Sequence, residues 1–212
     1  MAATKKKTAR KAAPRPRARK PAARRAAAPR ERAGLIEVGG KPATVLGPDV
    51  EVGQKAPHFT VQVGLWPGQE TWTALDALAA TAGKVRILTP LPSLDTSTCD
   101  AETRRFNEAA ADLGEHVRVI VISTDLPVAQ KRWCGSAGVE RLLTVSDHLD
   151  GDFGLKYGTL IKERRWHRRA VFVVDHNDVI QYAAYMPKLG DHPNYDAVLA
   201  VARRLAGLPE KK

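Results

Sequence analysis

Residues 85–99 read Val85-Arg-Ile-Leu-Thr-Pro-Leu-Pro92-Ser-Leu-Asp-Thr96-Ser-Thr-Cys99, an apolar segment and a short loop that ends in a cysteine. Residues 101–110, AETRRFNEAA, continue with a helical pattern. A cysteine between a strand and a helix tends to lie in the helix's first turn, where unpaired backbone N–H groups and the helix dipole favour a negative charge. Because the thiolate is the nucleophilic form of cysteine, the pattern predicts an activated nucleophile at Cys99.

The positive charge of the chain is confined to its N-terminal segment. The 212 residues carry a net charge of +11, but residues 1–32 alone hold 13 Lys or Arg and one acidic residue, a net charge of +12. The remaining residues hold 21 basic and 22 acidic side chains. A segment of Ala, Lys, Arg and Pro cannot bury enough apolar surface to order itself. We therefore expect a disordered basic tail over residues 1–33 and one folded domain over residues 34–212.

The composition also limits the compartment and the class of protein. Two cysteines do not form the framework of a small secreted protein. No apolar run approaches the roughly 18 residues of a membrane span, and no apolar core follows the basic N-terminus as in a secretory signal. We therefore expect a cytoplasmic protein, in which a disulfide between the two cysteines would be transient and catalytic.

The order of predicted elements indicates an α/β protein. A β-α-β-α unit is followed by a β-hairpin and a terminal helix, which is typical of the thioredoxin-like fold, a mixed central sheet flanked by helices. An additional β-hairpin is predicted at the N-terminus. The predicted strands are 35–38, 42–46, 59–63, 85–88, 117–122, 142–145, 170–174 and 179–185, and the predicted helices are 75–82, 99–113, 152–157, 195–205 and one that starts at Pro127 and contains Cys134.

Several motifs occur in one order along residues 34–206, and with them the chain resembles the peroxiredoxins, most closely the bacterial thiol peroxidases. The Pro92, Thr96 and Cys99 spacing matches the active-site signature of that superfamily. The other motifs are Gly40-Lys-Pro42, Gly53-Gln-Lys-Ala-Pro57-His-Phe59, Ser123-Thr-Asp125-Leu-Pro127-Val-Ala-Gln130-Lys-Arg-Trp-Cys134 and Arg169-Ala-Val-Phe-Val-Val-Asp175. The chain departs from the family pattern at Leu91, where an aromatic residue is usual, and in the basic tail.

The resemblance implies a peroxidase that reduces hydrogen peroxide and organic hydroperoxides. Cys99 would be the peroxidatic cysteine, which becomes a sulfenic acid, and Cys134 the resolving cysteine, which closes an intrachain disulfide. Arg169, carried over from the family motif, would stabilise the thiolate and fix the substrate. The Thr96 hydroxyl would donate to the peroxide or the sulfur, and Pro92 would shield the sulfur from water. The resemblance further implies a homodimer and reduction by thioredoxin.

Each of these residues also has a simpler interpretation. Cys99 could be a small buried apolar residue, and Thr96 a helix cap. Arg169 could belong to a solvated basic surface, and Cys134 could pack in the core beside an aromatic ring. If both cysteines react, they start on different predicted helices, with Cα atoms more than about 7 Å apart. Disulfide formation would then require partial unwinding around Cys99, Cys134 or both.

No cofactor is predicted. The six histidines are scattered without metal-ligand spacing, and neither a phosphate-binding glycine loop nor a dinucleotide fingerprint is present. A general disulfide oxidoreductase is disfavoured because no Cys-x-x-Cys pair occurs. The alternative from another class is a nucleic-acid-associated protein in which the tail is the main functional element. Such a tail would bind DNA or RNA weakly and without sequence preference, or would serve only as a solubilising extension.

Overall fold

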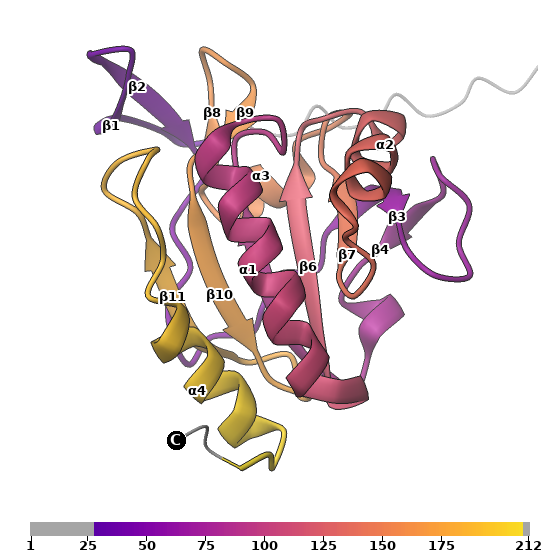
Figure 1. The fold of residues 1–212 in the computed structure, drawn as a ribbon. Coiled ribbons are helices and arrows are strands. Elements are labelled where there is room, and N and C mark those ends of the chain that lie inside the picture. The colour runs from indigo at the N-terminus through magenta and orange to yellow at the C-terminus, as the bar shows by residue number, and fades with distance from the viewer. Residues whose placement is uncertain (1–27, 210–212) are drawn as a thin grey trace, which may run out of the picture.

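The computed structural model describes residues 28–209, which fold around a mixed seven-stranded sheet (Figure 1). The strand order is β11-β10-β5-β6-β7-β3-β4, in which β5, β6 and β7 are parallel and every other pairing is antiparallel. The predicted mixed sheet of a thioredoxin-like fold is therefore confirmed. Its strands are β3 (Thr60–Leu65), β4 (Ala74–Asp76), β5 (Val85–Pro90), β6 (Val117–Ser123), β7 (Leu143–Ser146), β10 (Ala170–Val174) and β11 (Ile180–Tyr185).

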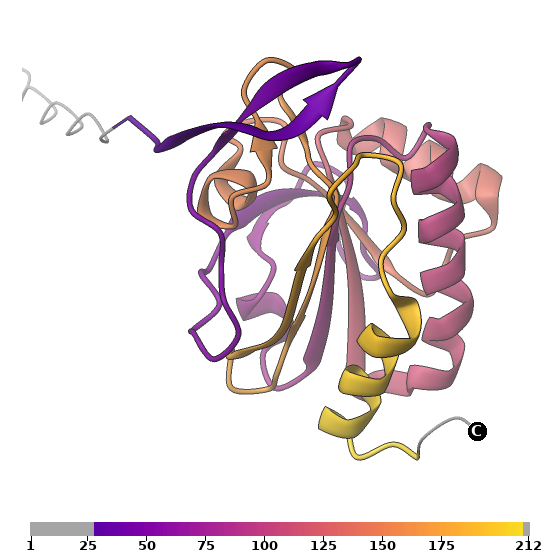
Figure 2. The same cartoon turned by 90° about the vertical axis from the view of Figure 1, so that its left-hand side faces the viewer.

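Helices cover both faces of this sheet. Figures 1 and 2 show α1 (Ser97–Leu113) and α4 (Tyr195–Leu205) on the same face, and α2 (Pro127–Ala137) packs there on β3 and β7. The short helix α3 (Asp152–Lys156) packs on the opposite face. Alternate residues of the strands supply the two cores, so that Ile87 and Val119 face α1, whereas Leu88 and Ile120 face α3. No helix in the described part of the chain is long and apolar enough to cross a membrane.

A second, smaller sheet contains the predicted N-terminal hairpin. It has the order β1-β2-β8-β9, with β1 (Glu31–Val38), β2 (Lys41–Leu46), β8 (Leu160–Ile161) and β9 (Trp166–His167). Strand β1 begins three residues before the expected start of the domain. Glu31, Arg32 and Ala33 are paired with residues 46, 45 and 44 of β2, and the ion pairs of Glu31 with Lys162 and of Arg32 with Asp49 add to this pairing. Most of the predicted tail, residues 1–27, lies outside the described residues.

The helix predicted over residues 75–82 is wrong. Residues 74–76 form β4 on the edge of the large sheet, and only the single 3₁₀ turn η1 (Ala79–Thr81) follows. Leu75 is paired with Val61, and the Asp76 carboxylate accepts a hydrogen bond from the Ala79 N–H, which starts the turn. The spacing of the apolar residues in this segment fits the period of a helix as well as that of a strand, and pairing with β3 favours the strand.

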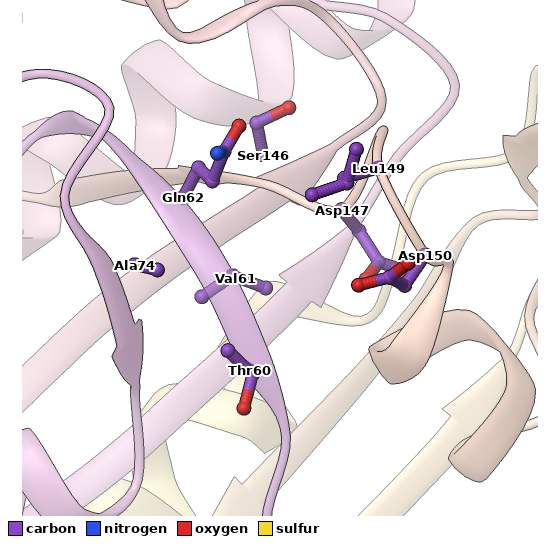
Figure 3. Close-up of a pocket in the computed structure, with 8 residues that line it drawn as sticks. All are labelled: Thr60, Val61, Gln62, Ala74, Ser146, Asp147, Leu149 and Asp150. Atoms are coloured by element: carbon purple, nitrogen blue, oxygen red, sulfur yellow. The ribbon is translucent and has the colours of Figure 1, made fainter. Parts of the chain in front are cut away.

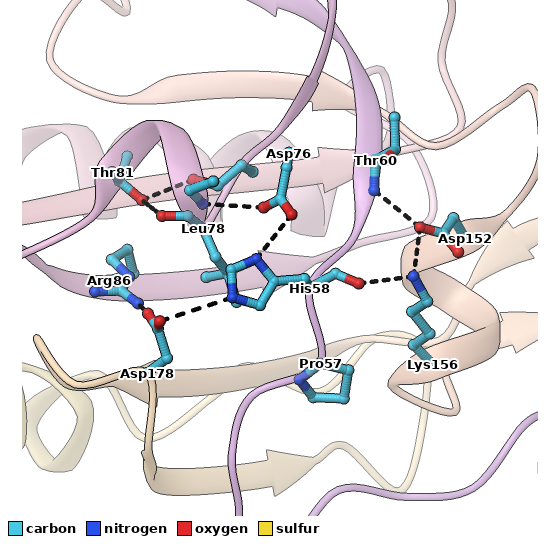
Figure 4. Close-up of polar contacts among 12 residues, drawn as sticks. Pro57, His58, Thr60, Asp76, Leu78, Thr81, Arg86, Asp152, Lys156 and Asp178 are labelled. Carbon is cyan, nitrogen blue, oxygen red and sulfur yellow. Dashed lines mark hydrogen bonds and ion pairs between the residues drawn. The ribbon is translucent and has the colours of Figure 1, made fainter.

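The edge of the sheet where β5 begins is closed by a polar cluster (Figure 4). Arg86 is fully buried and pairs with Asp178 in the turn between β10 and β11. His58 lies between two carboxylates, with Nδ1 2.7 Å from Asp76 and Nε2 3.7 Å from Asp178. These contacts join β4 to the β10–β11 turn at this edge.

A buried polar network joins α3 to the small sheet. The carboxylate of Asp147 accepts hydrogen bonds from two backbone N–H groups at the start of α3 and lies 3.5 Å from His167 Nε2. His167 Nδ1 is 3.0 Å from the Thr159 hydroxyl. Burial raises the pKa of Asp147 to about 7, and burial together with the charge of Arg165 lowers the pKa of His167 to about 3. Asp147 also lines a small pocket between β3 and the loop after β7, drawn in Figure 3.

We expect His167→Gln to alter how stability depends on pH. The unfolded chain binds a proton at His167 near its ordinary pKa of about 6.5, whereas the folded chain does not bind it until the pH approaches 3. The wild type should therefore lose about 2 kcal/mol between pH 7.5 and 5 through this group, a loss that the variant lacks. Urea unfolding at both pH values should show the destabilisation by His167→Gln shrinking by that amount as the pH falls. The same change at the exposed His116 should show no such trend, and a constant difference for His167→Gln would contradict a buried neutral imidazole.

Candidate active site

Cys99 is the third residue of α1, in the first turn, as the sequence predicts. Strand β5 ends at Pro90, the chain crosses the sheet edge, and the helix starts at Ser97 with Thr96 as its N-cap. The Cys99 side chain is fully buried and belongs to the apolar core beneath α1. Both cysteines are free thiols. The Cys99 sulfur is therefore shielded from solvent in this conformation.

A buried arginine contacts the Cys99 sulfur. Arg169, just before β10, is 1% exposed and donates from Nη2 to Cys99 Sγ at 3.1 Å. Its Nε and Nη2 also donate to the Leu189 carbonyl, at 3.2 and 3.1 Å. Burial alone would lower the pKa of Arg169, but the Glu102 carboxylate and the Cys99 sulfur raise it above its ordinary value. The sulfur thus has a permanent cation within hydrogen-bond distance, and the solvated-surface interpretation does not apply to Arg169.

Two residues absent from the sequence prediction hold that cation in place. The fully buried Glu102 forms an ion pair with Arg169 Nη1, and its other carboxylate oxygen accepts a hydrogen bond from the Thr89 hydroxyl of β5. Glu102 follows Cys99 by three residues, which places both on one face of the helix. That spacing was the available signal, because a carboxylate on the buried face of a helix requires a partner.

The other predicted residues of the loop occupy different environments. Pro92 is buried beside the end of β5. Thr96 is exposed, and its hydroxyl donates to the Ser93 carbonyl at 3.0 Å rather than to the Cys99 sulfur. The structure therefore brings Arg169 to the sulfur but leaves the Thr96 hydroxyl in a turn.

A chain of hydrogen bonds connects the Cys99 loop to α2. The Leu94 N–H donates to Asp125 Oδ2 at 2.8 Å, and the same oxygen accepts from the Ser123 hydroxyl at 2.8 Å. The Ser123 oxygen in turn accepts from Gln130 Nε2 of α2 at 2.9 Å. The loop that precedes the first cysteine and the helix that carries the second therefore share one polar network.

Cys134 is buried on the same side of the sheet as Cys99. It lies on α2, is 1% exposed, and its sulfur is 3.9 Å from the Thr144 hydroxyl of β7. Burial raises the pKa of Cys134 to about 11, so that it is a neutral thiol in this conformation. Helix α2 approaches β3 closely because residue 64 is glycine, where a Cβ would stand 2.1 Å from Gln130 Oε1. The two cysteines are thus on different helices over one core, as predicted.

A surface pocket lies near the start of α1. It is formed by the exposed side of α1 and the segment that leads into α4, and the guanidinium of Arg105 stacks on the Tyr195 ring at 4.1 Å. The lining residues are Ala101, Arg105, His192, Pro193 and Tyr195. Within residues 28–209 no group of three or more His, Cys, Asp or Glu side chains could hold a metal ion.

Comparison with known proteins identifies the family of the chain. Residues 51–199 match the Redoxin family. The chain is 46% identical over 159 residues to a thiol peroxidase of Oceanobacillus iheyensis, which covers 75% of this chain and 92% of that protein. It is 46% identical over 166 residues to a thiol peroxidase of Bacillus subtilis, covering 78% and 95%.

Solved structures give the same result. A peroxiredoxin-like protein from Aquifex aeolicus superimposes with a TM-score of 0.69 at 35% identity, over 82% of this chain and 97% of that one. A thiol peroxidase from Chromobacterium violaceum has a TM-score of 0.67 at 20% identity, over 81% and 95%, and so shares the fold. With a family match over most of the domain and relatives well above 30% identity, the chain belongs to the thiol peroxidase family of redoxins and is a thiol-dependent peroxidase.

Proposed function

We propose that Cys99 is the peroxidatic cysteine of this enzyme, acting on hydrogen peroxide and organic hydroperoxides. The thiolate attacks the terminal oxygen of the hydroperoxide and the O–O bond breaks. The attacked oxygen stays on sulfur as a sulfenic acid, and the departing oxygen leaves as an alkoxide or hydroxide that takes up a proton. The observation that carries this proposal is the buried Arg169, whose Nη2 lies 3.1 Å from the Cys99 sulfur.

Arg169 has two tasks in this step. Its positive charge favours the thiolate before the reaction, and it stabilises the negative charge that develops on the departing oxygen. Glu102 and the Leu189 carbonyl between them accept hydrogen bonds from all three of its nitrogens, which fixes the plane of the guanidinium. We also propose that Thr96 donates to a peroxide oxygen, exchanging its bond to the Ser93 carbonyl, and that the buried Pro92 limits the access of water.

We propose Cys134 as the resolving cysteine. Its thiol attacks the sulfur of the Cys99 sulfenic acid, an intrachain disulfide forms, and the oxygen leaves as water. Because its raised pKa of about 11 keeps the buried Cys134 protonated and weakly nucleophilic, this step requires α2 to open and expose the sulfur. The same opening would bring together two cysteines that lie on separate helices.

A thioredoxin-like protein is the proposed reductant. Its thiolate attacks one sulfur of the disulfide, and a second thiol of the reductant releases the mixed disulfide, so that both cysteines of this chain are regenerated. We propose that the organic part of a larger hydroperoxide occupies the pocket between α1 and the segment before α4, whose lining residue Ala101 follows Cys99 by two residues on α1. We propose no cofactor in the cycle.

We further propose that the enzyme is a homodimer in the cytoplasm. Exposed apolar side chains gather around the network that holds the Cys99 loop. Leu126 and Val128 begin α2, and Trp72 contacts the ring of His148, which is linked through the Ser146 hydroxyl to the Asp125 carbonyl. An apolar patch of this kind is typical of an interface between subunits.

The basic tail is proposed as a second functional element. The net charge of +12 in residues 1–32 is sufficient to neutralise several phosphates of DNA or RNA and to release their counterions. The binding would be weak, independent of sequence and sensitive to salt. It would bring the peroxidase to the nucleoid without altering the chemistry at Cys99.

The two-cysteine cycle predicts distinct outcomes for two variants. Stopped-flow oxidation by one equivalent of hydrogen peroxide, followed by thiol counting and intact mass, should show loss of two thiols in the wild type. Cys134→Ser should accumulate a sulfenic acid that dimedone traps, and Cys99→Ser should react no faster than a free thiol. Retention of both thiols in the wild type would eliminate the resolving role. Slow oxidation of the wild type that Cys99→Ser leaves unchanged would eliminate the peroxidatic one.

Loss of the cation at the sulfur should slow the first step. Arg169→Met removes the charge beside Cys99 and should lower the rate of oxidation by hydrogen peroxide on the order of 10²-fold or more. Arg169→Lys keeps the positive charge but not the planar guanidinium, and its oxidation rate should lie between those of the wild type and Arg169→Met. The exposed Arg164→Met is the control. Circular dichroism is needed to monitor folding, since Arg169→Met leaves Glu102 buried and unpaired. A folded Arg169→Lys variant that is oxidised at the wild-type rate would contradict the role given to the guanidinium geometry.

The apolar patch at the start of α2 should determine the oligomeric state. Leu126→Asp places a charge within the proposed interface and should shift the protein from dimer to monomer in sedimentation velocity. Val52→Asp, at an exposed apolar residue in the loop after β2, should leave the dimer intact. A wild-type monomer at micromolar concentration, or a dimer that Leu126→Asp does not weaken, would rule out this interface.

Deletion of the tail should abolish DNA binding and spare the peroxidase. Removing residues 1–28 keeps all of β1 and its ion pairs. We expect fluorescence anisotropy to detect salt-sensitive binding of the full chain to duplex DNA and none for the shortened chain, with equal rates of peroxide consumption. Equal retention of both forms on DNA at low salt would show that the tail is not the binding element.

A further inference from the structure

A basic pocket lies at the edge of the sheet opposite Cys99. Three parallel strands begin near there: Val85 at the start of β5 is paired with Val117 at the start of β6, and β7 starts three residues further along β6, with Leu143 paired with Ile120. A basic residue lies near the start of each of these three strands. Lys84 precedes β5, Arg118 is the second residue of β6, and Arg141 lies two residues before β7. All three line one pocket of about 370 Å³.

The charges in this pocket are not compensated within the domain. None of the ion pairs found in residues 28–209 involves Lys84, Arg118 or Arg141, and Arg118 has only the Val117 carbonyl as a hydrogen-bond acceptor. The neighbouring Arg86 behaves differently, because it is buried and paired with Asp178. One carboxylate, Glu140, lines the pocket and leaves a net charge of +2.

The remaining walls are apolar. Trp66 is partly exposed and packs on the core beneath α3, and the side chain of Leu143 belongs to the same core. A concave site with convergent cations and apolar walls is the usual form of a small-molecule pocket, and its volume is in the usual range. Arginine forks match the oxygen geometry of phosphate groups, and two of the three cations are arginines. The lining residues are Trp66, Pro67, Ala80, Thr81, Lys84, Arg118, Glu140, Arg141, Leu142 and Leu143.

We propose that this pocket binds a free small molecule that carries two or more phosphate groups. The site is independent of the peroxidase chemistry, because Lys84 precedes β5 and Cys99 follows the opposite end of that strand. A molecule with two phosphates can contact cations from three strands at once, whereas a single phosphate engages only part of the set.

Calorimetric titration of the full chain with inorganic pyrophosphate tests the proposal. We expect saturable binding to one site per chain, at least 10-fold tighter than binding of orthophosphate. The triple variant Lys84→Gln, Arg118→Gln and Arg141→Gln should weaken binding of pyrophosphate at least 10-fold. The triple variant Lys131→Gln, Arg132→Gln and Arg164→Gln loses the same charge at exposed sites elsewhere and should bind as the wild type does. Glu140→Gln should tighten binding severalfold, since it removes the one opposing charge.

Two results would overturn the proposal. One is the absence of saturable binding. The other is that both triple variants weaken the binding of pyrophosphate equally, or that neither weakens it. In either case the basic tail or the overall charge, and not the pocket, attracts the ligand. Equal affinity for orthophosphate and pyrophosphate would overturn the requirement for two phosphates. Oxidation of Cys99 by hydrogen peroxide serves as the folding control, and its rate should be unchanged in the pocket variant.

Discussion

The contact of the Arg169 guanidinium with the Cys99 sulfur is the interaction around which this domain is organised. A cation that is 1% exposed is tolerated only if every N–H group has an acceptor. The acceptors come from Glu102 on α1, Leu189 before α4 and Cys99 itself, and Glu102 is held by Thr89 of β5. Strand β5, helix α1 and the segment before α4 therefore have to meet at one point, and the register of β5 with β10 makes that meeting possible.

The two cysteines are linked mechanically as well as by proximity to a common core. Asp125 holds the loop before Cys99 and, through Ser123, is bonded to Gln130 on the helix of Cys134. Gly64 allows that helix to approach the sheet closely. A change in the loop on oxidation would therefore weaken the attachment of α2 at the step for which Cys134 is proposed. In the proposed cycle this coupling would favour resolution over a second reaction with peroxide.

The sequence sufficed to predict the elements with strong periodicity and the position of Cys99 in the first turn of its helix. The β-branched run of β6, Pro127 at the start of α2 and Cys99 in the first turn of α1 are local signals that the fold preserves. A helix is predicted over residues 75–82 in place of the strand at residues 74–76 because pairing with β3 is a tertiary effect. Strands β8 and β9 are not predicted because they have only two residues each. Arg169 could not be chosen among its neighbouring arginines without the family resemblance. Glu102 and the pair of Asp147 and His167 depend on burial, which a single sequence does not record.

The burial of Cys134 has a consequence for damage to the enzyme. In the proposed cycle the Cys134 thiol stays protonated until α2 opens, so the rate of that opening would set the lifetime of the Cys99 sulfenic acid. During this interval a second peroxide molecule could oxidise the sulfur to the sulfinic acid, which a disulfide reductant does not reverse. The stability of one helix would then determine the peroxide concentration at which the enzyme is inactivated instead of regenerated. A tightly packed α2 would make a peroxidase suited to low peroxide, and a loosely packed one would survive acute oxidative stress.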